Sequence, residues 1–218
     1  VSPEAARRGR SCSLFSRLAA CGLAPRFLDV QFRMHPRLAE FPSREFYSGR
    51  LQSGVPGSAR PPPRGVAWPH PDVGVAFINC AAAEARVGTS RANAEEAALI
   101  ARLLTRLLAA GDVAADEVGV VSPYAAQVRA LRRSLGRVDV DTVDGFQGQE
   151  REVVLVSTVR SEGSGVGFLA DWRRLNVLLT RARRGLVVVG HARTLAQDPA
   201  WGRWLLWARR SGFFMQPG

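Results

Sequence analysis

The sequence contains no lysine, and all of its 30 basic residues are arginine. A phosphate-binding loop of the pattern GxxxxGK[ST] needs a lysine, so these residues alone cannot form a complete P-loop ATPase site. Cysteine is also scarce: three are present without CxxC spacing, and the three histidines are scattered along the chain. These patterns predict neither a disulfide framework nor a zinc site, and we expect no metal ligands in this chain.

Long hydrophobic runs are lacking as well. The apolar stretch at 97–111 is interrupted by Arg102 and Arg106 and falls short of the roughly 20 residues that cross a membrane. No apolar segment of the secretory type follows the first arginines. We therefore expect a soluble protein of the cytoplasm, with the nucleus as a second location and no membrane partner. The chain begins with Val1 rather than Met, which we interpret as a sign of an excerpt from something longer.

The charge of the chain is strongly one-sided. Thirty basic against 19 acidic residues give a formal net charge of +11. Such an excess favours polyanionic partners, either nucleic acid or the phosphates of a nucleotide. A compositional bias of the source genome is the alternative explanation for arginine over lysine, but it leaves the net charge in place. The 46% hydrophobic share excludes a disordered polar chain, and 218 residues predict one domain.

Strands and helices alternate along most of the chain, which predicts an α/β fold. Several of the expected strands are apolar on both faces, as in a parallel sheet sandwiched between helices. The carboxyl ends of such strands lie along one edge, where ligands bind in open α/β sheets. We expect strands at 26–31 (short and buried), 73–79, 117–122, 138–143, 152–159 and 186–190, helices at 14–22, 93–110, 124–135, 172–184 and 201–210, and a surface loop at 49–71.

Three segments carry polar residues that a hydrophobic core does not need. The first is QFRMHP at 31–36, directly after an expected strand. Here Arg33 can face a phosphate and the ring of Phe32 can face a base. The alternatives are a structural ion pair for Arg33 and a core position for Phe32.

The second segment is TVDGFQGQE at 142–150, between two expected strands. Glycines on both sides of Gln147 let the backbone approach a ligand closely, although a turn or bulge explains them equally well. Glu150 can accept a ribose hydroxyl or contribute to a cation site.

The third segment is RRLNVLLTRARR at 173–184, which we expect on a helix with Arg174 and Arg181 two turns apart. Arginine presented rigidly suits the transition state of phosphoryl transfer. A solvated basic face is the alternative, and for Arg183 and Arg184 it is the one we favour.

Together and in this order, the three segments resemble the second RecA-like domain of superfamily 1 RNA helicases of the up-frameshift type, the motors of nonsense-mediated mRNA decay. The resemblance runs from about residue 13 to the end. It is also carried by 41–43 (FPS), 46–47 (FY), 88–90 (GTS), 121–124 (VSPY) and 186–190 (LVVVG). It implies a RecA-like fold of the P-loop NTPase type without the P-loop. The whole of 1–218 would be one such domain, with 1–12 a linker from a missing first RecA-like domain.

The resemblance also implies roles for residues that face ATP between the two domains. Arg181 matches the arginine finger, Arg33 a second contact of the γ-phosphate, and Glu150 a group at the ribose or γ-phosphate side. Gln31 and Phe32 would lie at the adenine, and Gln147 and Gly148 in a loop that couples nucleotide state to the nucleic-acid groove. The cofactor would be ATP with Mg²⁺, whose metal ligands are expected from the first domain.

On the other edge, the resemblance implies a path for single-stranded nucleic acid along Ser122, Pro123, Tyr124, Thr142 and Val143. The expected partners are single-stranded RNA, with DNA as the alternative, and the first RecA-like domain of the same protein, in a monomer. A DNA-directed or dual-specificity superfamily 1 helicase and a non-catalytic nucleic-acid-binding module stay open as alternative functions. Without the P-loop lysine, we expect this chain alone to hydrolyse no ATP above background.

Overall fold

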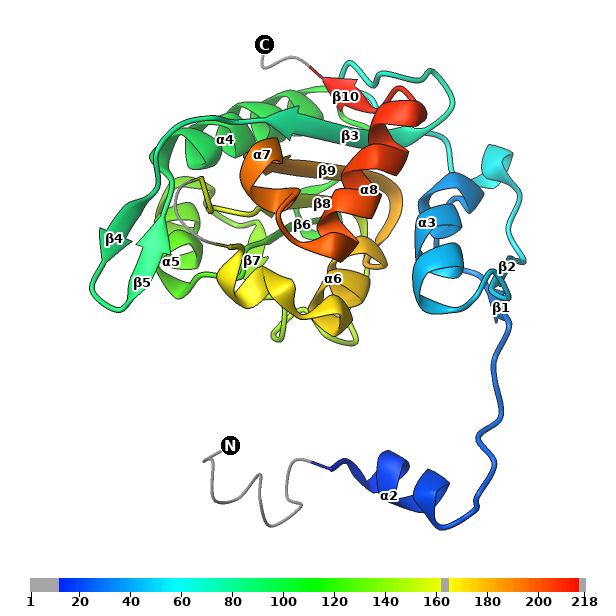
Figure 1. Ribbon diagram of the computed structural model, residues 1–218. Helices are drawn as coiled ribbons and strands as arrows, with labels where there is room; N and C mark the ends of the chain where they lie inside the picture. The colour runs from blue at the N-terminus through cyan, green and yellow to red at the C-terminus, as the bar shows by residue number, and fades with distance from the viewer. Residues whose placement is uncertain (1–11, 162–164, 216–218) are drawn as a thin grey trace.

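A six-stranded parallel sheet forms the centre of the computed structural model, which describes residues 12–161 and 165–215 (Figure 1). The predicted linker at 1–12 therefore lies outside the described residues except for its last position. The strands follow the order β10-β3-β9-β8-β6-β7. Their bounds are β3 (Gly74–Asn79), β6 (Val118–Val121), β7 (Asp139–Asp141), β8 (Arg151–Ser157), β9 (Ala182–Gly190) and β10 (Phe214–Met215). The predicted α/β class and the parallel sheet are confirmed.

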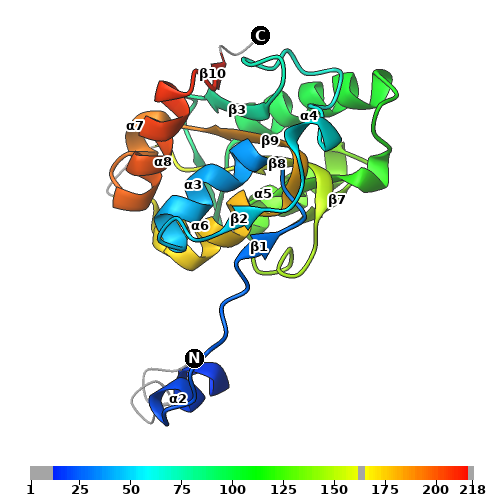
Figure 2. The same ribbon diagram turned by 90° about the vertical axis from the view of Figure 1, so that its right-hand side faces the viewer.

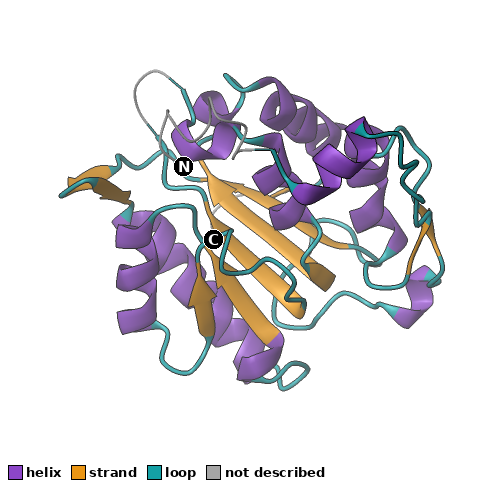
Figure 3. Cartoon of the chain, turned by 90° about the horizontal axis from the view of Figure 1, so that it is seen from below, coloured by secondary structure: helices purple, strands orange, loops and turns teal. Residues whose placement is uncertain are grey.

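Helices cover both faces of this sheet, as Figure 3 shows in cross-section. Alternate side chains of each strand point to opposite faces. In β3, Val75 and Phe77 belong to one buried cluster, while Ala76 and Ile78 belong to the other. The first cluster is completed by α3 (Pro36–Phe46), α6 (Trp172–Leu179), α7 (Ala192–Leu195) and α8 (Pro199–Arg210), and the second by α4 (Ala94–Ala109) and α5 (Ala125–Ser134). No described helix is long and apolar enough to span a membrane.

Several elements appear where no regular structure was predicted, among them α7, β10 and the two described next. Helix α3 begins after His35, whose Nδ1 accepts a hydrogen bond from the amide of Arg37 at 3.0 Å. It contains Pro42, a residue type that usually kinks or ends a helix. The other is a small hairpin of β4 (Ala85–Val87) and β5 (Ser90–Ala92), which turns at Gly88 with a φ of +61°.

The helix predicted at 172–184 is wrong in its second half. Helix α6 ends at Leu179, Thr180 caps it, and β9 starts at Ala182. The backbone beyond 181 is taken into the sheet, where β9 pairs with β8 on one side and with β3 on the other. Arg183 and Arg184 therefore lie on a strand. They make ion pairs with Glu152 at 2.9 Å and Asp112 at 2.8 Å, so the predicted solvated basic face is also wrong.

The N-terminal part of the described chain stands away from this body (Figures 1 and 2). Helix α2 (Leu14–Ala20) has no buried residue. The buried strand predicted at 26–31 is reduced to β1 (Val30–Gln31), which pairs in parallel with β2 (Gln52–Ser53) in the loop at 49–71. Apolar side chains here are open to solvent: Leu28 is 84% exposed. The prediction of burial fails because little covers this segment among the described residues: even Phe27, which contacts Tyr47 and Arg50, is 38% exposed.

The exposure of Leu28 can be tested against a leucine of the core. In this chain, Leu28→Ala should change the free energy of unfolding by no more than ~0.5 kcal/mol, since the residue is mostly in solvent. The matched variant Leu155→Ala removes a fully buried side chain of β8 and should cost ~2–5 kcal/mol. Denaturant titration measures both. A comparable loss in the two variants would show that the N-terminal segment is packed.

Candidate nucleotide and nucleic-acid sites

The structure brings Arg33, Glu150 and Arg181 together at the amino ends of β8 and β9. Glu150 directly precedes β8, and Arg181 directly precedes β9. Nε of Arg33 donates to the carboxylate of Glu150, and its Nη1 donates to the carbonyl of Thr180 at 2.8 Å. Three predicted residues from distant parts of the sequence therefore share one cluster.

Arg181 is held in place by the end of α6. Its Nε donates to the carbonyl of Val177 at 2.9 Å, its Nη1 to the carbonyl of Gln149 at 3.2 Å, and its Nη2 to Oγ1 of Thr180 at 2.9 Å. Burial lowers the pKa of Arg181, and the charge of Arg33 lowers it further. Two like charges close together make a site at which a bound anion would be stabilising.

Glu150 balances part of this positive charge. The hydrogen bond from Arg33 lowers the pKa of Glu150, with further contributions from the charges of Arg183 and Arg181. The carboxylate is therefore ionised at neutral pH. The structural ion pair considered for Arg33 does exist. Together with Arg181, it brings two guanidinium groups and one carboxylate close to one another. Phosphate oxygens and a ribose hydroxyl fit this donor and acceptor set.

Gln31 and Phe32 precede Arg33 in the chain, but the side chain of Gln31 is hydrogen-bonded and that of Phe32 is exposed. The amide of Gln31 is used inside the turn: its Oε1 accepts from the amides of Arg33 (2.9 Å) and Met34 (2.7 Å). Its Nε2 donates to the carbonyl of Met34 and to Ser53. Phe32 is 67% exposed, so the alternative of a core position is wrong, and its ring lies against Gly54, where a Cβ would come within 2.4 Å of it.

The loop at 142–150 is anchored by one ring and bent by its glycines. Phe146 is fully buried, whereas Gln147 and Gly148 are exposed. Gly148 has a φ of +84°, and a Cβ on Gly145 would lie 2.5 Å from the carboxyl carbon of Asp141. A turn that requires glycine therefore explains both positions, and Gln147 stays solvent-facing between them.

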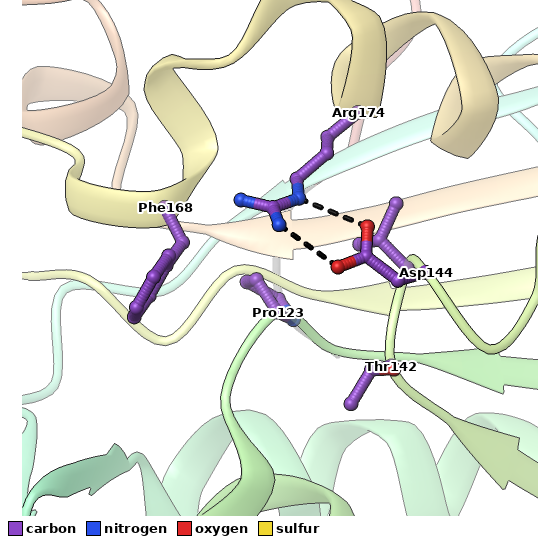
Figure 4. Close-up of a pocket in the computed structure, with 6 residues that line it drawn as sticks. Pro123, Thr142, Asp144, Phe168 and Arg174 are labelled. Atoms are coloured by element: carbon purple, nitrogen blue, oxygen red, sulfur yellow. Dashed lines mark hydrogen bonds and ion pairs between the residues drawn. The ribbon is translucent and has the colours of Figure 1, made fainter. Parts of the chain in front are cut away.

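At the carboxyl ends of β6 and β7, a cavity of about 140 Å³ collects most of the predicted nucleic-acid residues (Figure 4). It is lined by Pro123, Thr142 and Val143 together with Asp144, Phe168 and Arg174. The side chains of Ser122 and Tyr124 are buried just behind this edge. Ser122, Tyr124 and Val143 would therefore meet a ligand at this cavity mainly through the backbone.

Several residues at this edge were not predicted here. Arg174 was considered together with Arg181 for phosphoryl transfer, but the structure places it at this edge instead. Arg174 holds Asp144 through two hydrogen bonds, Nε to Oδ1 at 3.0 Å and Nη2 to Oδ2 at 2.8 Å. A second cavity of about 450 Å³ adjoins the first and shares Phe168 and Arg174 with it. It adds Thr89, Arg91, Tyr124, Arg160, Gly167 and Asp171. One sequence signal points to it, the GTS at 88–90 that belongs to the resemblance.

The two sets of predicted residues thus lie at opposite edges of the sheet. We expected ligands at the carboxyl edge, and this is wrong for Arg33, Glu150 and Arg181, which gather at the amino edge. Glu150 and Arg181 stand directly ahead of β8 and β9, and Arg33 joins them there through its hydrogen bonds to Glu150 and to the carbonyl of Thr180. The loop at 142–150 leaves the carboxyl edge at Thr142 and reaches the amino edge at Glu150. The loop runs beside α6, and Arg174 of α6 donates two hydrogen bonds to Asp144 near the start of the loop.

A buried polar network supports the carboxyl end of β8. The carboxylate of Glu96, on α4, accepts hydrogen bonds from Oγ of Ser157 at 2.6 Å and from the amide of Val159 at 2.9 Å. Val159 has a φ of +69°, and the amide of Arg160 donates to the carbonyl of Thr158 at 2.8 Å. This is a γ-turn of the rare, strained kind, on a β-branched residue. It delivers Arg160 to the second cavity, and Glu96 stabilises it.

Comparison with known proteins identifies the family. A family model described as an AAA domain matches residues 10–193. The chain belongs to this family. It is 40% identical to the "Regulator of nonsense transcripts 1 homolog" of Drosophila melanogaster, over 93% of this chain and 18% of the relative. It is 42% identical to the protein of the same name in Arabidopsis thaliana, over 91% of this chain and 17% of the relative.

A yeast relative carries the activity in its name. The chain is 39% identical to the "ATP-dependent helicase NAM7" of Saccharomyces cerevisiae, over 98% of this chain and 23% of the relative. The resemblance to helicases of the up-frameshift type is thereby confirmed, and the sheet of the second RecA-like domain agrees with it. The chain spans about a fifth of the length of the relatives it matches. Among the described residues, no group of three or more His, Cys, Asp or Glu side chains could hold a metal ion.

The Glu96 network predicts a specific dependence of stability on pH. Burial raises the pKa of Glu96 from 4.5 to about 7, against the hydrogen bonds from Ser157 and Val159. Between these two values the folded state holds one more proton than the unfolded state. The free energy of unfolding should therefore fall as pH rises from about 4.5 to about 7, by ~3 kcal/mol at most.

The variant Glu96→Gln should remove this part of the slope, as measured by denaturant titration at several pH values. Glu95→Gln is the matched control, because Glu95 is half-exposed on the same helical turn and pairs with Arg102 at 3.7 Å. If Glu96→Gln and the wild-type chain keep the same slope, the network does not titrate as described.

Proposed function

We propose that this chain is the second motor domain of an ATP-dependent helicase that acts on single-stranded RNA in mRNA decay. The observation that carries the proposal is the cluster of Arg33, Glu150 and Arg181 at one edge of the sheet, opposite an edge that carries the predicted nucleic-acid residues. The names of the relatives support the helicase activity and the pathway. The fraction of their length that the chain covers makes the activity a property of a longer protein.

The amino edge would close an ATP site against a first RecA-like domain. Bound there, ATP with Mg²⁺ supplies the phosphoryl group that is transferred to water, with the metal ligands coming from the other domain. Arg181 and Arg33 donate to the γ-phosphate, where their fixed charge stabilises the transition state. The exposed ring of Phe32 stacks on adenine, and Gln31 holds the turn that presents it. Glu150 keeps Arg33 in position and accepts from the ribose.

The carboxyl edge would hold the nucleic-acid strand. Pro123 and Thr142 line its cavity directly, while Ser122, Tyr124 and Val143 contribute backbone groups. Contacts of this kind reach phosphates and sugars and carry no sequence information, as a translocating motor requires. Nothing in this cavity distinguishes a 2′-hydroxyl, so a comparison of matched RNA and DNA strands separates the RNA helicase from a DNA-directed one.

The loop at 142–150 would couple the two edges. Asp144 is tied to Arg174 at the nucleic-acid side, and Glu150 is tied to Arg33 at the nucleotide side. The carbonyl of Gln149 is held by Arg181. A shift of either arginine when ATP binds or leaves would therefore be passed along Gln147 and Gly148 to Asp144. Closure and opening of the domain pair would then move the strand.

The segment before the sheet would belong to the interface with the first RecA-like domain. Besides Leu28, exposed apolar residues occur throughout it: Leu14, Phe15, Leu18, Leu23, Phe27 and Val30. The helix and the extended stretch that follows it carry many apolar side chains, as buried elements do. A first RecA-like domain packed against them would bury these side chains. The domain boundary then lies near 31 rather than at 12. We propose a monomer of the cytoplasm, with the nucleus as a second location.

The role of Arg181 gives the direct test. In the full-length protein, Arg181→Ala should lower the RNA-stimulated ATPase rate by ~10²-fold or more, because the transition state loses a fixed positive charge. The affinity for single-stranded RNA should stay close to wild type. Arg102→Ala, on the outer side of α4, is the control and should leave both unchanged. An unaltered ATPase rate in Arg181→Ala would refute the assignment.

A further inference from the structure

Phe168 is an exposed aromatic ring on an otherwise anchored turn. It lies in the 3-10 helix η3 (Gly167–Ala170) and is 61% exposed. Val166 before it and Leu169 after it are buried. The indole Nε1 of Trp201 also donates to the carbonyl of Leu169 at 3.0 Å. The ring is therefore held out toward solvent by a fixed backbone.

The turn is pressed against the wall of the nucleic-acid edge. Gly167 has a φ of +59°, and a Cβ at this position would lie 2.7 Å from Oη of Tyr124 and 2.9 Å from Nη1 of Arg160. The positive φ favours glycine here, and a larger residue would also have to displace the ends of the Tyr124 and Arg160 side chains. The rings of Phe168 and Tyr124 stand 5.9 Å apart at 68°, edge to face. The guanidinium carbon of Arg174 lies 5.8 Å from the centre of the Phe168 ring.

Phe168 is also the aromatic ring that lines both cavities of this edge, beside Pro123 in one and Tyr124 in the other (Figure 4). Figure 4 shows it facing the Arg174–Asp144 pair across the first cavity. Both neighbours are fixed, since Arg174 is held by two hydrogen bonds and Tyr124 is buried. A flat ligand at this edge therefore meets a preformed apolar surface.

The charges around the ring are balanced. Arg91 and Arg160 both contact Glu84, and Arg174 contacts Asp144. With Asp171 at the cap of α6, three guanidinium groups face three carboxylates. Attraction of phosphate alone does not single out this spot. What the ring offers is stacking, which every base accepts because each has a π face.

We infer that Phe168 stacks on a base of the bound single strand and fixes its register at the carboxyl edge. The ligand is a nucleobase of any identity, and this inference rests on the proposed function of that edge. A purely structural role is disfavoured because most of the ring is in solvent. Removing it would leave the fold unchanged and weaken binding only when the strand carries bases.

The test compares variants of the protein on strands that carry bases and on strands that do not. In the full-length protein, Phe168→Ala should weaken binding of an oligouridylate of roughly 12 nucleotides by about 5- to 150-fold. Binding of an abasic ribose-phosphate strand of the same length should hardly change. Phe168→Trp should restore the affinity for the oligouridylate.

Trp172→Ala is the control, because Trp172 is also exposed but lines neither cavity. A strand carrying 5-iodouridine should crosslink to Phe168 on irradiation.

The outcomes separate this inference from the proposed function. Equal losses for both strands, or no loss for either, with a wild-type protein that binds RNA, would overturn the role of Phe168 and leave the proposed function standing. A wild-type protein that binds neither strand would overturn both. A loss confined to the strand with bases, restored by Phe168→Trp, supports the inference.

Discussion

The contact between Arg33 and Glu150 is the interaction on which the arrangement of the site depends. It joins the start of the domain to the beginning of β8, across most of the sequence. The same guanidinium also donates a hydrogen bond to the carbonyl of Thr180, which connects the end of α6 to this ion pair. Without this carboxylate, Arg33 and Arg181 would repel each other at close range. One acidic residue thus allows two positive groups to stand ready for an anion.

The second constraint is the parallel sheet, which keeps two sites apart while linking them. Strands β8 and β9 are buried along most of their length and do not bend easily. Movement between the edges is left to the loop at 142–150 and to α6, which lie side by side outside the sheet. Each is attached at both edges, through Asp144 and Glu150 in the loop and through Arg174 and Thr180 at the helix. A connection of this kind can transmit a change without rearranging the core.

Much of the fold was predictable because its strands are short apolar runs and its long helices have a regular apolar stripe. Helix α4 is an example: Ile100 and Leu107 in its apolar stripe are fully buried. What could not be predicted depends on contacts between distant segments. The sequence from 172 to 184 has a continuous helical pattern. Only the pairing of its last residues with β8 and β3 makes them part of a strand. The buried strand at 26–31 failed for the opposite reason, since the described part of the chain leaves most of its apolar side chains exposed.

The candidate site was predictable in its members but not in its layout. Arg33, Glu150 and Arg181 came from the resemblance. The strands expected at 152–159 and 186–190 place Glu150 and Arg181 ahead of a strand, but no pattern in the sequence brings Arg33 to them. Glu96 was hidden because an acid at the third position of a helix also fits an ordinary cap, and only the structure shows it fully buried. Phe168 was hidden because a single aromatic in the run VGFLA at 166–170 looks like core.

In the proposed motor, the loop at 142–150 connects the nucleotide edge to the nucleic-acid edge. This coupling is measured by the ratio of RNA dissociation constants with and without a non-hydrolysable ATP analogue, in the full-length protein and in Asp144→Asn. We expect a ratio well away from 1 in wild type, of about 5- to 150-fold, that moves toward 1 in the variant. Affinity for the analogue without RNA should stay unchanged. An identical ratio in both proteins would show that the loop does not couple the two edges.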